Sequence, residues 1–128
     1  MSHRVELNQM AASVLAAAGV EFDASSQLNQ ALVGTFLFGM ISAHGMTHKL
    51  TPSEVRALAI VVFKDTLHYD DAAAAEGVQA CIDASLSGHH DTMNAILHRG
   101  IDGHAAYVGN DVRKTSENLR NILAHFAT

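Results

Sequence analysis

The chain has 128 residues, of which 48% are hydrophobic and 16% are charged, and its net charge is −5 with neutral histidines. This composition excludes a disordered tail and predicts one folded domain over residues 1–128. With 8 Lys and Arg against 13 Asp and Glu and a single cysteine, a nucleic-acid-binding protein is disfavoured, and an internal disulfide or a four-cysteine zinc site is excluded.

Helical periodicity covers the N-terminal half of the chain, where apolar residues recur at intervals of three and four. The first helix is predicted over residues 5–18 and ends before Gly19, a residue type that suits a helix C-terminus. The second, over about residues 26–43, is apolar on nearly every face, which predicts a central position. The third has the clearest start, because the run TPSE at residues 51–54 forms a capping box with proline at the first helical position.

The C-terminal half shows the same periodicity, and strand signals are weak throughout the chain. The third helix is expected to end near residue 67, and three more helices follow: from 70 or 71 to 88, from 91 or 92 to 107, and from 111 to 127. Six helices with short connections predict a compact all-α bundle.

Nothing in the sequence resembles a membrane anchor or a secretory signal. The longest apolar run, residues 57–63, is much shorter than the roughly 20 residues of a membrane span. Polar residues interrupt the N-terminal apolar stretch at Glu6, Asn8 and Gln9. We therefore expect a cytoplasmic protein with one reduced thiol.

Histidine is unusually frequent, with nine in the chain. His3 and His125 lie near the ends of the sequence, where we expect solvated side chains. His44 and His48 are expected around the loop that follows the second helix. The favoured interpretation is a set of loop and helix-end histidines that bind no metal and no cofactor.

A metal site is an alternative for the other histidines. The side chains that could take part are of types that zinc accepts: His89, His90, His98, Asp102 and His104. Their spacing matches no standard zinc motif.

The densest set of polar candidate residues lies in the fifth predicted helix. Asn94, His98 and Asp102 are four residues apart and share one helix face. His98 and Asp102 could hydrogen-bond, as in the acid–base pair of a small hydrolase. The sequence has none of the common enzyme motifs, such as a nucleophile elbow, a Walker loop or HExxH.

Two glycines in this helix, Gly100 and Gly103, would let another backbone approach closely. That backbone could belong to this chain or to a second copy in a homodimer. The segment is therefore open to three interpretations: a polar stripe beside a tight helix crossing, a recognition surface, or a catalytic site.

The run TMNAILHRGIDGH at residues 92–104 resembles the immunity protein 48 family of bacterial polymorphic-toxin systems. Four other stretches are similar to this family, and the resemblance covers about residues 7–107: AAGVEFD, LVGTFLFGM, LTPSEVRAL and ACIDASLSG. The sequence departs from the family pattern after His104, where AAY stands in place of a nearby glutamine and tryptophan. The resemblance implies a small cytoplasmic protein that is not an enzyme. It implies stoichiometric binding of a cognate toxin delivered by a contact-dependent or type VI system.

The resemblance also suggests which residues contact the toxin. Five residues occupy the family's signature positions: Asn94, His98, Arg99, Asp102 and His104. Tyr107 is added because Arg and Tyr are preferred anchors of protein interfaces. The same signature could instead pin helix crossings within the fold, and the sequence leaves the two roles open.

Overall fold

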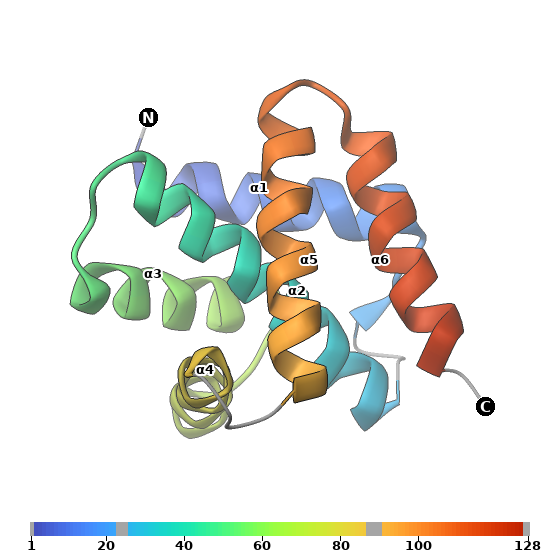
Figure 1. Ribbon diagram of the computed structural model, residues 1–128. Coiled ribbons are helices and arrows are strands. Elements are labelled where there is room, and N and C mark those ends of the chain that lie inside the picture. The colour runs from blue at the N-terminus through green and yellow to red at the C-terminus, as the bar shows by residue number, and fades with distance from the viewer. Residues whose placement is uncertain (1, 23–25, 87–90, 127–128) are drawn as a thin grey trace.

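The computed structural model describes residues 2–22, 26–86 and 91–126. These residues form six α-helices and no strand, which confirms the all-α prediction (Figure 1). The helices are α1 His3–Ala18, α2 Gln27–Thr47, α3 Pro52–Asp65, α4 Asp71–Ser85, α5 Asp91–Val108 and α6 Val112–Phe126. None of the described helices is both long and apolar enough to cross a bilayer.

Helix α2 is the centre of the bundle, as its nearly uniform apolar surface predicts. Every residue from 32 to 41 is buried, and α2 contacts α3, α4, α5 and α6. Helix α5 crosses in front of α2, with α3 and α4 to one side and α6 to the other (Figure 1). One cluster of buried apolar side chains draws on all six helices, so each helix contributes to the same core.

Two glycines allow α2 and α5 to approach to backbone contact. A Cβ added to Gly39 would lie 3.1 Å from the Gly100 Cα and would overlap the carbonyl group of Leu97. A Cβ added to Gly100 would overlap the carbonyl oxygen of Phe36. Any side chain larger than hydrogen at either glycine would therefore force the two helices apart.

The predicted start of α3 is confirmed in detail. The Thr51 hydroxyl accepts a hydrogen bond from the Glu54 amide at 3.2 Å, and the Glu54 carboxylate accepts one from the Thr51 amide at 3.0 Å. Two amides that a helix start leaves without a backbone partner are thereby satisfied.

We expect Thr51→Ala to lower the free energy of unfolding by about 1 kcal/mol, because it removes one of these two bonds. The melting temperature should fall by about 4 °C. Ser53→Ala is the matched control, since Ser53 is exposed in the same turn. Equal melting temperatures for the two variants would contradict a stabilising role for the cap.

The predicted helix ends differ from the structure mainly in α2, which continues to Thr47 rather than to residue 43. His44 therefore lies inside a helix and is buried, and its predicted place near a loop is wrong. Helix α4 ends at Ser85, earlier than the predicted residue 88, which lies outside the described residues. The His44 ring contacts His3 of α1.

Candidate functional site

The six residues predicted to contact a partner all lie on α5, but they face three different hollows. Asn94 and His98 line a groove of about 420 Å³ bounded by α2, α3, α4 and α5. Arg99 and Asp102 line a hollow against α6. His104 and Tyr107 line a third hollow, which α1 and α2 complete. One partner surface cannot contact all six residues, because their side chains point in directions spread around the whole helix.

Two of the six are tied into the fold by hydrogen bonds. The Asn94 side-chain amide donates to the Ala84 carbonyl at the end of α4, at 2.9 Å. The Arg99 guanidinium donates to the Asn118 carbonyl at 3.5 Å, and the Asn118 side chain donates to the Arg99 carbonyl at 3.1 Å. These bonds join α5 to α4 and to α6, so Asn94 and Arg99 have a structural role.

The two glycines of the same segment are also used within the chain. Gly100 contacts the α2 backbone, and a Cβ on Gly103 would lie 2.8 Å from the Phe36 ring. The Gly103 carbonyl accepts a hydrogen bond from the Thr115 hydroxyl at 2.8 Å. The sequence left open whether the backbone that approaches this helix belongs to the same chain or to a second copy. In the structure it belongs to the same chain.

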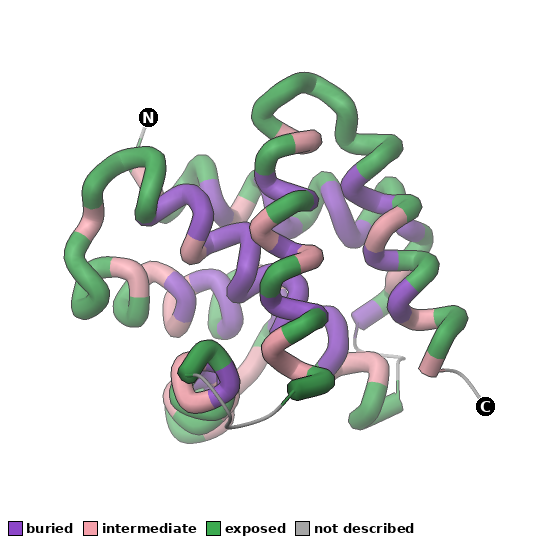
Figure 2. The backbone as a smooth tube through the Cα atoms, in the orientation of Figure 1, coloured by how far each residue is buried: buried purple, intermediate pink, exposed green. Residues whose placement is uncertain are grey.

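His98 and Asp102 differ from these residues, because both side chains are exposed on the outer face of α5. Figure 2 shows exposed positions along this face and buried positions where α5 crosses α2. No hydrogen bond or ion pair joins His98 to Asp102 in the described part of the chain, so the acid–base pair that the sequence left open as an alternative is not formed. Both side chains are available to a partner.

The groove beside His98 is largely apolar. Its apolar lining comes from Phe38, Met46, Leu50, Val55, Ile82, Leu97 and Ile101. Met46 stands at the end of α2 with 64% of its surface exposed. Arg56 and His98 supply polar groups at the same groove. An exposed methionine beside an apolar groove is typical of a protein-binding surface, because its flexible side chain adapts to a partner.

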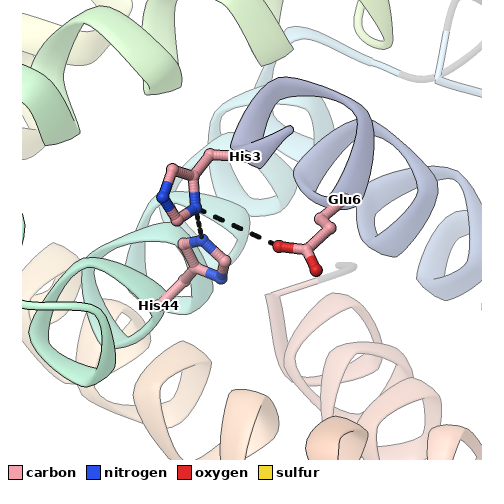
Figure 3. Close-up of side chains that lie close together, drawn as sticks. All are labelled: His3, Glu6 and His44. Atoms are coloured by element: carbon pink, nitrogen blue, oxygen red, sulfur yellow. Dashed lines mark hydrogen bonds and ion pairs between the residues drawn. The ribbon is translucent and has the colours of Figure 1, made fainter. Parts of the chain in front are cut away.

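The third hollow contains a cluster of histidines that the sequence did not predict. The His44 ring is buried, and its Nε2 lies 2.8 Å from the Nδ1 of His3 (Figure 3). The rings of His44 and His48 have centroids 4.2 Å apart, and His104 lies 6.2 Å from His44. His3 joins this cluster across α1 and α2 while its side chain stays 39% exposed, so the predicted solvated position of His3 holds in part.

Burial and neighbouring rings lower the pKa of two histidines of this cluster, His44 and His104. Burial, followed by the nearby rings of His48 and His3, lowers the pKa of His44 to about 4. Burial also lowers the pKa of His104, with a smaller contribution from His48. His104 is only 6% exposed, so little of its surface could reach a partner.

The metal ligands suggested by the sequence do not converge. His98 and Asp102 are exposed on the outer face of α5, whereas His104 lies in the hollow against α1 and α2. His89 and His90 lie outside the described residues.

A family model decides which proteins this chain is related to: the model described as immunity protein 48 matches residues 6–127. The chain belongs to the immunity protein 48 family. Neither a curated protein nor a solved structure matches it significantly. The match extends past the stretch that suggested the resemblance and includes α6, which packs against α5.

Two features of this immunity protein were not predicted from its sequence. The apolar groove is built from four helices, and its main exposed residue, Met46, belongs to a helix end that was predicted to finish earlier. The His3–His44 contact joins residues 41 positions apart. The i,i+4 spacing of His44 and His48 indicates that their rings lie close together on one helix face. The contact of His44 with His3 on α1 could not be predicted from spacing.

Proposed function

We propose that this immunity protein protects the bacterium that makes it by binding one cognate toxin in the cytoplasm. The binding is stoichiometric and blocks the toxin, which belongs to a contact-dependent or type VI competition system. Membership of the immunity protein 48 family supports the class of function.

The proposed binding surface rests on one observation: an apolar groove lies beside exposed polar side chains. Met46 and the apolar groove lining offer area for a buried interface core. His98 and Asp102 lie exposed along the neighbouring face of α5. An apolar centre with a polar edge is the usual anatomy of a protein interface.

The proposed inhibitor uses no catalytic step. What it needs is a rigid surface, and the backbone contact between Gly39 and Gly100 holds α5 at a fixed place over α2. The bonds of Asn94 and Arg99 brace the same helix against its neighbours. A pre-ordered surface loses less conformational freedom on binding, which favours tight complexes. The net charge of −5 favours association with a basic toxin.

The proposal is tested by identifying the partner and then measuring protection. The purified, folded chain is used as bait in lysate from the native strain, and its stoichiometric partner is identified by mass spectrometry. The partner's toxic domain is then expressed in a heterologous host with and without this chain. We expect growth arrest without the chain, growth with it, and a purified complex of one to one by light scattering.

Two results would contradict the proposal. One is a folded bait that captures no stoichiometric protein from lysate in which the toxin gene is expressed. The other is a captured protein whose toxicity the chain does not relieve.

A further inference from the structure

Three side chains of metal-ligating type converge where α1 meets α2. They are His3, Glu6 and His44, and one ligand atom of each lies within 4.8 Å of the other two. The His3 Nδ1 lies 2.8 Å from the His44 Nε2 and 4.0 Å from a Glu6 carboxylate oxygen (Figure 3). His3 and Glu6 are one turn apart on α1 and therefore share the face that looks toward the His44 ring.

We propose that His3, Glu6 and His44 bind one Zn²⁺ ion between α1 and α2. Two imidazoles and one carboxylate form a known protein ligand set for zinc. Nitrogen ligands favour zinc and its transition-metal neighbours over Mg²⁺ and Ca²⁺, which prefer oxygen. This set differs from the residues that the sequence suggested, because its members come from helices far apart in the chain.

The geometry requires only small adjustments. Zinc–ligand bonds of about 2.0–2.2 Å in a tetrahedral arrangement place ligand atoms about 3.3 Å apart. The His3–His44 separation would widen slightly from 2.8 Å, and the Glu6 carboxylate would move slightly closer than its 4.0 Å from His3. The side chains of His3 and Glu6 are 39% and 44% exposed, so they can rotate, while the buried His44 ring stays fixed.

The surroundings leave room for a fourth ligand. His44 and Glu6 line a hollow of about 300 Å³, which also contains the rings of His48 and His104. A water molecule or an incoming side chain can enter from this hollow. The bound ion would join the first turn of α1 to the last turns of α2.

The test uses protein purified without a polyhistidine tag and stripped with a chelator. Zinc binding is measured by calorimetry, and the bound metal is counted by elemental analysis after dialysis. We expect one zinc per chain with a Kd of about 1 µM or tighter, and a higher melting temperature with zinc than without it. His3→Ala and Glu6→Gln should each weaken binding at least about tenfold, and since both side chains are partly exposed, these variants should stay folded.

Two controls separate this site from weak binding by other histidines. His125→Ala and His68→Ala remove exposed histidines on other parts of the surface, and both should bind zinc as the unchanged chain does. The proposal is overturned if the unchanged chain binds zinc with a Kd above about 100 µM. It is also overturned if His3→Ala binds as tightly as the controls. Toxin binding is measured separately, so failure here leaves the proposed function standing.

Discussion

We expect Gly100→Ala to lower the free energy of unfolding by about 3 kcal/mol. The new methyl group would overlap the carbonyl oxygen of Phe36, which is backbone and cannot rotate away. The α2–α5 crossing would have to open, and Gly39 would lose its contact with the Gly100 Cα. In a chain of 128 residues the melting temperature should fall by about 10 °C, measured by thermal circular dichroism.

Gly109→Ala is the matched control, because the same methyl group there would lie 3.4 Å from the nearest atom, an ordinary van der Waals distance. We expect its melting temperature to stay within about 2 °C of the unchanged chain. A Gly100→Ala protein as stable as the Gly109→Ala protein would show that the two helices can separate without cost.

The second large effect is expected in partner binding. Met46→Glu should weaken toxin binding by at least about 30-fold, which corresponds to about 2 kcal/mol. The reason is that a carboxylate would replace an apolar side chain at the groove and would lose its water in the complex. Because Met46 is 64% exposed in the free chain, the substitution should leave the melting temperature nearly unchanged. Affinity is measured by calorimetry with the captured toxin domain.

Leu28→Glu is the control for this experiment. Leu28 is 51% exposed and lies near the start of α2, 18 residues before Met46, so it is about 27 Å away along the helix. The control should bind as the unchanged chain does. If Met46→Glu binds equally well, the groove is not the toxin-binding surface.

The signature segment on α5 combines residues that hold the fold together with residues that are exposed on the surface. Asn94, Arg99 and Gly100 hold α5 against α4, α6 and α2. His98 lies between them in the sequence and Asp102 follows Gly100, and both of these side chains are exposed. Scaffold and surface residues alternate because a helix turns by about 100° per residue, so neighbours in sequence face different sides.

The sequence by itself determined the helices, their order and the capping hydrogen bonds at the N-terminus of α3. Helical periodicity and the capping box are local signals, carried by residues within one or two turns, and the structure confirms all six helices. The nearly uniform apolar surface of the second helix also predicted its central place, because such a helix can bury its whole surface only when other helices surround it.

Only the tertiary structure decided what the polar residues do. The sequence placed Asn94 and His98 on one face but could not show that Asn94 bonds to α4 while His98 faces outward. It also could not bring His3 to His44, 41 residues away. Such contacts depend on how whole helices cross, and the crossing follows from close packing at positions such as Gly39 and Gly100. That packing is a property of pairs of surfaces, and no single segment of the sequence contains it.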